Sequence, residues 1–484
     1  MRSMIRTLSR FFAAVLMAVP TLTAQDLAQG RIVDRVPCLS APEWSYALYL
    51  PSDYRSGKTW PVLFLFDPGA RGATAVEAFR PAAEEYGWIL VGSNDSRNGP
   101  LDASLRAARA IHADALARFP VDARRVYAAG FSGGARVASL FPRAVGREIA
   151  GIIGCGAGLA TGVAPADLGA AAYVGLTGLA DFNYAEMKAL DLAMDAAGPL
   201  HRFLFFEGRH EWPGEAVCSR AAAWLEIEAM KGGRRPKDEA LARAVVGREL
   251  DEAAAFESAG RVFWAADRLE AARRLAEGVC DLPDPVARIE ALKDRPEYAR
   301  FLAAEKKRDR RSAGFRGEFG RAFGAIEGDE AGGGAAVGLV LRETGVGPLK
   351  KEARGAKTVE DRGLASRLLF DMSFAAQARA GDLYRGGDLV RAGAYLDVAI
   401  AACEEGLARE PGLYFDRACV AARLGDRSRA LGALETAIAK GFDDLAALET
   451  DLDLAPVRDT DRFRELVALV KKKGSNLNFF SFPI

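Results

Sequence analysis

Ser132 is the residue of this sequence best suited to act as a nucleophile, because it stands at the centre of a G-x-S-x-G pattern, GFSGG at 130–134. The apolar residues 126–129 predict a short buried strand before it, and residues 135–140 predict the start of a helix after it. A serine between a strand and a helix lies on a tight, strained turn, and the flanking glycines let neighbouring backbone pack closely. The turn exposes the hydroxyl and points the first free N–H groups of the helix at whatever the serine attacks. We therefore predict a catalytic serine here rather than a merely structural turn.

A nucleophilic serine needs a base within hydrogen-bond reach, and only three histidines are available. His112 falls inside a predicted helix, where an ordinary packed histidine is the simpler interpretation. His201 opens a predicted strand, away from the carboxyl ends of strands where the active sites of open α/β sheets lie. His210 follows the last predicted strand, in the loop FEGRHEWP at 206–213. We predict His210 as the base.

The base in turn needs an orienting acid, and Asp181 directly follows the penultimate predicted strand, in TGLADFN at 177–183. The chain order is then Ser, Asp, His, an order that serine hydrolases with alternating strands and helices use. Three other aspartates remain alternatives: Asp167 precedes that strand, and Asp191 and Asp195 fall within a predicted helix. An aspartate at a strand end is also often a helix cap. Asp181 is the predicted acid.

An acyl-transfer site also needs two N–H groups that stabilise the oxyanion. The residue after the nucleophile, Gly133, is predicted to supply one of them. The other is predicted to come from Gly69 or Ala70, in the loop after the apolar run at 61–66.

The segments around these residues alternate between strands and helices. A continuous apolar run such as 61–66 is typical of a strand buried on both faces of a mainly parallel sheet. Pro81 is expected to break or restart the helix predicted at 74–86. The predicted strands lie at 31–39, 44–50, 61–66, 88–92, 126–129, 149–154, 172–177 and 202–206, and the other helices at 101–119, 184–197 and 215–230. This alternation predicts an α/β domain.

At roughly 150 residues per domain, a chain of 484 residues suggests two or three domains. The polar stretch KGGRRPK at 231–237 is predicted to be a linker between an α/β domain at 25–230 and an all-α domain at 238–484. Within the second domain, helical periodicity at 238–311 and 363–474 flanks a glycine-rich stretch, which includes 328–334 and is predicted to be a mobile loop.

The last region contains an internal repeat. The pattern G-D-x3-A-x3-L-x2-A-I at 387–400 recurs 38 residues later at 425–438. Small residues at fixed positions let paired helices approach closely, and stacked pairs bury what one pair cannot. The segment at about 375–470 resembles tetratricopeptide repeats, whose unit is about 34 residues long. The alternative is a generic alanine-rich helical bundle.

The first 24 residues have the three-part layout of a secretory signal peptide: arginines at 2, 6 and 10, an apolar run at 11–19, and a breaker with small residues at 20–24. We predict cleavage after Ala24 and a secreted or periplasmic protein; the alternative is an apolar helix that stays attached. No later stretch is long and apolar enough to be a transmembrane helix.

The composition excludes several kinds of partner. Lys plus Arg equals Asp plus Glu, at 65 each, so no electrostatic reason exists to expect nucleic acid or an acidic membrane surface. The six cysteines are scattered and form no metal-ligand spacing. There is also no dinucleotide-binding glycine pattern and no Walker sequence, so we predict neither a cofactor nor a metal.

Taken together, these motifs resemble the α/β-hydrolase superfamily, and in particular small esterases of the dienelactone-hydrolase and polyhydroxybutyrate-depolymerase-like groups. The resemblance covers about residues 31–230 and rests on YLP at 49–51, PVLFLF at 61–66, RVYAAGFSGG at 125–134, Gly178 with Asp181, and GRHEWP at 208–213. It implies Ser132 as nucleophile, His210 as base and Asp181 as orienting acid, with an acyl-enzyme formed from an ester or similar substrate. One departure concerns the loop after the third strand, where DPG at 67–69 replaces the usual His-Gly and leaves the second oxyanion donor open.

The leading hypothesis is an exported carboxylesterase for a small-molecule or polymeric ester, with a helical-repeat domain that binds a protein partner. A serine peptidase of the same fold is the nearest alternative, because the triad does not distinguish an ester from an amide. A third hypothesis is an inactive, hydrolase-like interaction protein. The presence of all three triad residue types in order argues against it.

Overall fold

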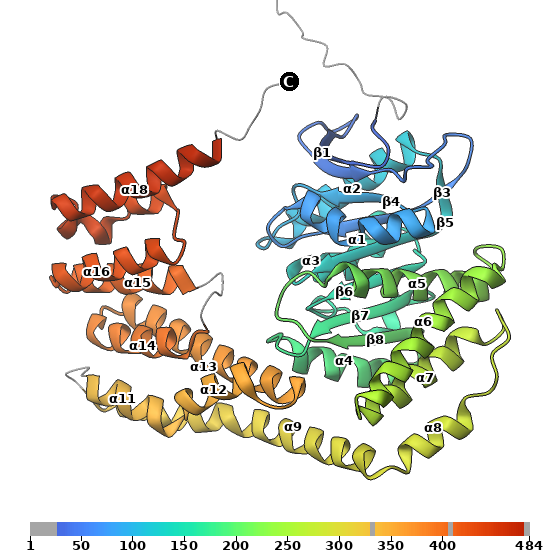
Figure 1. The fold of residues 1–484 in the computed structure, drawn as a ribbon. Coiled ribbons are helices and arrows are strands. Elements are labelled where there is room, and N and C mark those ends of the chain that lie inside the picture. Colours follow the sequence, from blue (N-terminus) through green and yellow to red (C-terminus); the bar gives the residue numbers. More distant parts are fainter. Residues whose placement is uncertain (1–26, 330–333, 405–409, 479–484) are drawn as a thin grey trace, which may run out of the picture.

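The computed structural model contains a sheet domain with helices on both faces, followed by a region built of helices alone (Figure 1). It describes residues 27–329, 334–404 and 410–478. The predicted signal peptide, residues 1–24, lies outside the described residues, as do residues 330–333 of the glycine-rich stretch predicted to be a mobile loop.

The sheet has eight strands in the order β1-β2-β4-β3-β5-β6-β7-β8. β2 pairs antiparallel with β1 and with β4, and all other neighbours are parallel. The strands are β1 (Ile32–Pro37), β2 (Ser45–Tyr49), β3 (Trp60–Phe66), β4 (Ile89–Ser93), β5 (Val121–Phe131), β6 (Gly151–Cys155), β7 (Ala172–Gly178) and β8 (His201–Phe206). This topology is that of the α/β-hydrolase fold and confirms the predicted fold class.

β3 illustrates why the central strands are apolar throughout: all seven of its residues are buried. Successive side chains of a strand point to opposite faces of the sheet. Leu63 and Leu65 belong to the hydrophobic core on one face, and Val62, Phe64 and Phe66 belong to the core on the other. Both faces of β3 are therefore covered by helices.

The first of these cores includes residues from α1 (Gly72–Tyr86) and α5 (Glu215–Lys231). The second includes residues from α2 (Leu101–Arg118), α3 (Gly133–Val145) and α4 (Tyr184–Ala197), with the short 3-10 helix η1 (Pro165–Leu168) beside α4. Because helices cover both faces of the sheet, the loops at the carboxyl ends of the parallel strands are the place where a site can form.

α1 continues through Pro81, so the break expected there is wrong. A proline inside a helix removes one hydrogen bond and crowds the preceding turn, at a cost of about 3 kcal/mol. The neighbours Phe79, Ala82 and Ala83 are fully buried in the core. Burial of this face holds the helix together, a tertiary effect that local propensity does not report.

Packing against the sheet domain continues past the predicted boundary at residue 230. Val245 and Val246 of α6 (Glu239–Ser258) and Leu275 of α7 (Val262–Ala276) lie in the same core as Leu225 of α5. Residues 231–237, predicted as the linker between two domains, connect α5 to α6, and both helices pack on the sheet domain. The sequence composition of α6 and α7 predicts helices, but it does not indicate whether they pack on the sheet domain or on the later helices.

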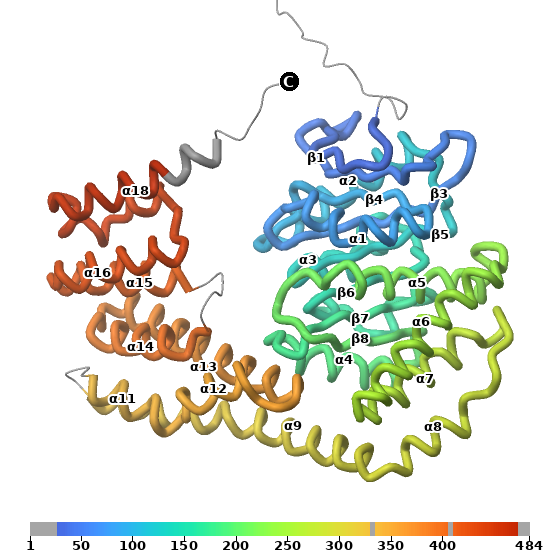
Figure 2. Tube along the Cα trace, in the orientation of Figure 1, coloured from blue at the N-terminus to red at the C-terminus, as the bar shows by residue number. Residues whose placement is uncertain are grey.

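The remaining chain is helical. It leaves the sheet domain through α8 and α9, and the later helices then stack beside that domain (Figure 2). These elements are α8 (Val286–Lys293), α9 (Pro296–Ala322), α10 (Gly324–Glu327), α11 (Gly334–Glu343), α12 (Val346–Gly355), α13 (Val359–Arg385), α14 (Leu389–Ala402), α15 (Glu410–Arg423), α16 (Arg427–Ala439), α17 (Leu445–Thr450), the 3-10 helix η2 (Leu452–Val457) and α18 (Asp461–Asn478).

The sequence repeat occupies equivalent positions in two helix pairs, α13–α14 and α15–α16. Asp388 and Asp426 cap α14 and α16 by accepting hydrogen bonds from backbone N–H groups three residues later, at 3.1 and 2.9 Å. The glycines before them have φ values of 85° and 80°, a conformation that favours glycine. The repeated unit is thus a helix–turn–helix; its membership of the tetratricopeptide class stays a prediction.

Two further findings concern the whole described chain. None of its helices has both the length and the apolar character needed to cross a membrane. The six cysteines all lie within the described residues, and no disulfide joins any of them.

Candidate active site

The turn between β5 and α3 places Ser132 in a strained conformation, with φ 53° and ψ −120°. Only two described residues other than glycine have a positive φ, and Ser132 is one of them. A Cβ atom on Gly130 would lie 2.1 Å from the carbonyl oxygen of Gly134, and one on Gly134 would lie 1.9 Å from that of Phe66. Both glycines of the pattern are therefore required sterically, so that the turn can pack against β3.

The structure brings the predicted nucleophile, base and acid together. His210 Nε2 lies 2.9 Å from Ser132 Oγ, and His210 Nδ1 lies 2.9 Å from Asp181 Oδ1. The three residues follow the carboxyl ends of β5, β7 and β8. These parallel strands lie close together in the sheet, and their carboxyl ends point the same way. With Nδ1–H donating to the carboxylate, Nε2 is left as the acceptor for the serine hydroxyl. The arrangement can remove the proton of a serine that attacks a carbonyl.

The alternative acids lie elsewhere. Asp191 and Asp195 face His201, at 3.5 and 3.4 Å from its Nε2. Asp167 forms an ion pair of 2.9 Å with Arg143. These aspartates therefore belong to other polar contacts of the sheet domain.

His112 is buried within α2 between aromatic side chains. Its ring centroid is 5.5 Å from that of Phe64 and 5.7 Å from that of Phe141. Burial lowers the pKa of His112 to about 4, and Arg147 adds to this effect. His112 is a neutral core residue, in line with the simpler interpretation of the sequence.

Asp181 is almost completely buried, with 1% of its surface exposed. Burial raises its pKa, and this effect outweighs the hydrogen bonds from His210 and from the backbone N–H of Asn183, which act in the opposite direction. Gly156, with φ 63°, lies directly against the pair: a Cβ there would be 2.8 Å from Asp181 Oδ2 and 3.3 Å from His210 Nδ1. Sequence reasoning missed Gly156, because it follows β6 outside any recognised motif.

The two amides predicted as second oxyanion donors are engaged elsewhere. Gly69 N–H donates to Asp67 Oδ1 at 2.7 Å, and Ala70 N–H donates to the backbone oxygen of Asp67 at 3.2 Å. Both N–H groups thus donate within their own loop, to Asp67. The expectation that Gly69 or Ala70 supplies the second oxyanion donor is therefore wrong. Gly133, the other predicted donor, is the first residue of α3, where an N–H has no partner within the helix.

Asp67 is fully buried and is the centre of a polar cluster. Its carboxylate accepts hydrogen bonds from Arg71 Nε at 2.9 Å and from Trp212 Nε1 at 2.8 Å, besides the one from Gly69. Burial alone would raise the pKa of Asp67, but these hydrogen bonds together hold it below its usual value. Because Trp212 is two residues after His210, the cluster ties the loop after β3 to the loop that carries the base.

Asn98, in the loop between β4 and α2, lies against the start of α3. Its side chain fills the space beside Gly133, where a Cβ would come within 1.8 Å of Asn98 Oδ1. Its own backbone N–H donates to the carbonyl oxygen of Pro68 at 2.8 Å. An amide group therefore stands next to the first N–H of the helix. No motif marked this residue in the sequence.

The helical region also reaches the site. α13 approaches the loop after β7 so closely that a Cβ on Gly363 would lie 2.4 Å from the carbonyl oxygen of Leu179. Two ion pairs join the helical region to the segment just before His210: Arg362 with Glu207 at 2.8 Å, and Glu404 with Arg209 at 3.1 Å. The loops that carry the acid and the base are thus held from outside the sheet domain.

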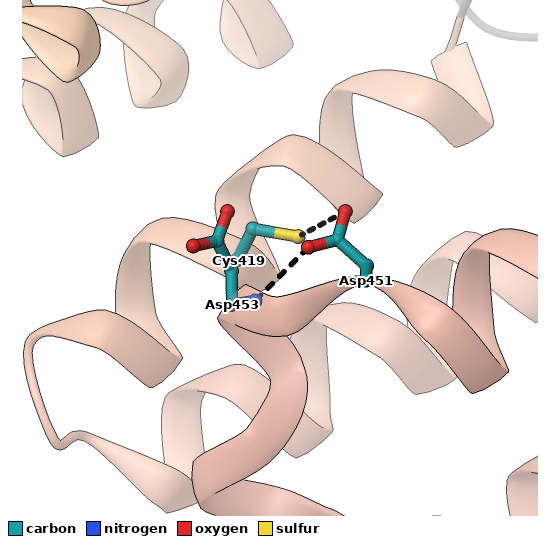
Figure 3. A group of neighbouring side chains, drawn as sticks. All are labelled: Cys419, Asp451 and Asp453. Carbon is teal, nitrogen blue, oxygen red and sulfur yellow. Dashed lines mark hydrogen bonds between the residues drawn. The ribbon is translucent and has the colours of Figure 1, made fainter.

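A second polar cluster lies in the helical region, where Cys419 of α15 meets Asp451 and Asp453 at the start of η2 (Figure 3). One ligand atom from each lies within 4.8 Å of the others. Asp451 accepts from the backbone N–H of Asp453 at 3.0 Å and from the thiol at 4.0 Å, and Asp453 accepts from the Tyr384 hydroxyl. Burial raises the pKa of the Cys419 thiol, which stays protonated. These contacts join α15 to the turn before η2.

No protein-family profile matches the chain, and no curated protein sequence matches it. Among solved structures, an esterase from the archaeon Pyrobaculum calidifontis is 14% identical, with a TM-score of 0.34, over 43% of this chain and 88% of that one. The fluorophosphonate-binding serine hydrolase FphF of Staphylococcus aureus is 15% identical, with a TM-score of 0.32, over 41% and 99%. EstE1, a thermophilic carboxylesterase cloned from a metagenomic library, is 14% identical, with a TM-score of 0.34, over 42% and 90%.

These solved structures are esterases and serine hydrolases of α/β-hydrolase fold, and the likeness covers the N-terminal part of this chain.

Proposed function

We propose that this protein is a serine hydrolase that cleaves carboxylic esters through Ser132, His210 and Asp181. The observation that carries the proposal is the chain of two hydrogen bonds, each 2.9 Å long, from the hydroxyl through the imidazole to a buried carboxylate. The strained φ of 53° at Ser132 supports it, because backbone strain of this kind persists where surrounding structure maintains it, often at active sites.

In the first step, Ser132 Oγ attacks the carbonyl carbon of the ester while His210 Nε2 takes the hydroxyl proton. Asp181 keeps the imidazole in the required tautomer and stabilises the positive charge that develops on it. The burial of the carboxylate strengthens this interaction, because little water competes for it.

The tetrahedral intermediate carries a negative oxygen that needs donors placed in advance. We assign one to the N–H of Gly133 and the second to the side-chain amide of Asn98. Asn98 is chosen because it stands beside Gly133, whereas the N–H groups of Gly69 and Ala70 already donate to Asp67. In the structure Asn98 Oδ1 lies nearer than Nδ2 to the Cβ position of Gly133, so the amide must turn by 180° to present its nitrogen to the oxyanion.

The intermediate collapses when the bond to the alcohol oxygen breaks and His210 gives its proton to that oxygen. The alcohol leaves, and the acyl group stays bound to Ser132. A water molecule, deprotonated by His210, then attacks the acyl-enzyme and releases the acid, which restores the hydroxyl. We further propose that residues 1–24 direct export and that the helical pairs bind a protein partner.

The test is labelling of the purified protein with a fluorophosphonate probe, which reacts with activated serines. We expect labelling of the wild type, and none of Ser132→Ala or His210→Ala. His201→Ala is the matched control, since that histidine faces Asp191 and Asp195 instead, and it should label normally. A correctly folded wild type that does not label would overturn the proposal. If it labels, hydrolysis of short-chain aryl esters and of the matching amides separates an esterase from a peptidase.

A further inference from the structure

Phe182, the residue after the proposed acid, lies on the imidazole of the proposed base. The ring centroids of Phe182 and His210 are 3.9 Å apart. Phe182 also meets Phe370 of α13, with centroids 4.2 Å apart and an angle of 10° between the ring planes. Only the ring of Phe182 therefore lies between His210 and a side chain of the helical region.

The row of rings continues along α13. Phe374 follows Phe370 by four residues, which puts both on one face of the helix, and their rings are stacked at 5.9 Å and 10°. Phe182 and Phe370 are half-buried, and 58% of the Phe374 surface is exposed. We call Phe182, Phe370 and Phe374 the aromatic strip. It leads from the base to the surface of the protein.

The aromatic strip is held in place by specific contacts. The Arg367 guanidinium, on the same helix, donates to the carbonyl oxygen of Leu179 and lies 4.1 Å from the centroid of the Tyr184 ring. Gly363 permits the close approach of α13 to that loop. These contacts fix α13, and with it the rings of Phe370 and Phe374, beside the loop that carries Asp181.

The position of the strip indicates which part of an ester it would contact. In the proposed mechanism His210 gives its proton to the oxygen of the leaving alcohol, so the alcohol lies on the imidazole side of the scissile bond. The strip begins on that imidazole. The acyl group is bound to Ser132, the residue that precedes α3.

Resting on the proposed esterase function, we propose that the aromatic strip binds the alcohol part of the substrate and selects esters of aromatic alcohols. Aromatic rings pack favourably edge-on or offset against other rings, which a short alkyl group cannot match. The helical region would then contribute to substrate choice directly.

The test compares 2-naphthylmethyl acetate with ethyl acetate, two esters that differ only in the alcohol, on wild type, Phe374→Ser and Phe370→Leu. Leu452→Ser is the control, because Leu452 is a still more exposed apolar side chain, at 83%, in the remote helix η2. We expect the wild type to prefer the naphthylmethyl ester. We also expect both phenylalanine variants to reduce that preference about five-fold, mainly through KM, as the loss of one ring contact implies. The rate of fluorophosphonate labelling of Leu452→Ser should match that of the wild type.

The outcomes separate the two proposals. A wild type that does not label would overturn the proposed function itself. Normal labelling with an unchanged preference in both variants would overturn the aromatic strip as a substrate site. An equal loss on both esters, together with slower labelling, would make the strip a packing element and overturn it as well.

Discussion

The guanidinium of Arg367 donates a hydrogen bond to the backbone carbonyl oxygen of Leu179, and this bond joins the helical region to the loop that carries Asp181. The same guanidinium stacks on Tyr184, the first residue of α4, on the far side of that loop. α13 therefore holds the loop at both ends, although about 180 residues of chain separate them. A catalytic acid depends on such support, since small displacements of reacting groups are costly.

Arg367→Met removes the donor but keeps an apolar stem over Tyr184. We expect kcat for a short aryl ester to fall about ten-fold or more, with KM little changed, because the acid loop is positioned less well. Arg379→Met is the matched control, since Arg379 lies further along α13 and pairs with Glu327 at 2.8 Å. Steady-state kinetics check the prediction. Equal kcat values for the two variants would contradict it, and partial recovery in Arg367→Lys would support it.

Gly156→Ala tests the space around the triad. The new Cβ would lie 2.8 Å from Asp181 Oδ2 at a backbone φ of 63°, so we expect both a displaced acid and a strained backbone. The strain should cost about 1–2 kcal/mol in the free energy of unfolding. Gly162→Ala shares the strain, at φ 80°, but has nothing within 4 Å of the added atom. Gly156→Ala should lose at least as much stability in urea as Gly162→Ala, because only its added atom meets buried neighbours, and only Gly156→Ala should lose fluorophosphonate labelling. A fully labelled Gly156→Ala would contradict this geometry.

Asn98→Ala tests the assignment of the second oxyanion donor. Removal of one such donor lowers kcat by about 100- to 1000-fold in a serine hydrolase with an asparagine donor, and we expect a loss of that order with KM nearly unchanged. Asn94→Ala, in the same loop, removes a side chain that donates to the backbone oxygen of Asp34 at 3.0 Å and should leave kcat near wild type. If Asn98→Ala retained full kcat, the second donor would have to come from elsewhere.

Asp67→Asn removes a buried charge whose pKa is held below its usual value by the hydrogen bonds of Arg71, Trp212 and Gly69. A carboxyl with a lowered folded pKa stabilises the protein above its unfolded pKa, about 3.9, and loses that contribution as the pH falls through the folded value. We expect the variant to be about 2 kcal/mol less stable than the wild type at pH 7. This difference should shrink below about pH 4. Urea unfolding at pH 7, 5 and 3.5 measures it, and a difference that does not vary with pH would contradict the role of the charge.

The sequence and the structure agree where the signal is local. A strand, a glycine-flanked turn and a helix in direct succession predict Ser132 as the nucleophile, and the structure contains all three. Asp181 and His210 each follow a predicted strand, and parallel strands bring their carboxyl ends to the same end of a sheet. The break predicted at Pro81 is wrong for the opposite reason, since burial of one helix face overrides a local helix breaker.

By itself, the sequence determined the alternation of strands and helices, the turn at Ser132, the chain order of the three proposed catalytic residues and the 38-residue helical repeat. These properties follow from periodicity and turn chemistry within a few neighbouring residues. Only the tertiary structure decided that α6 and α7 pack on the sheet domain, that Asn98 stands beside Gly133, and that Phe370 stacks on Phe182. Such contacts join segments far apart in the chain, and their strength comes from packing and desolvation, which leave no local pattern in a single sequence.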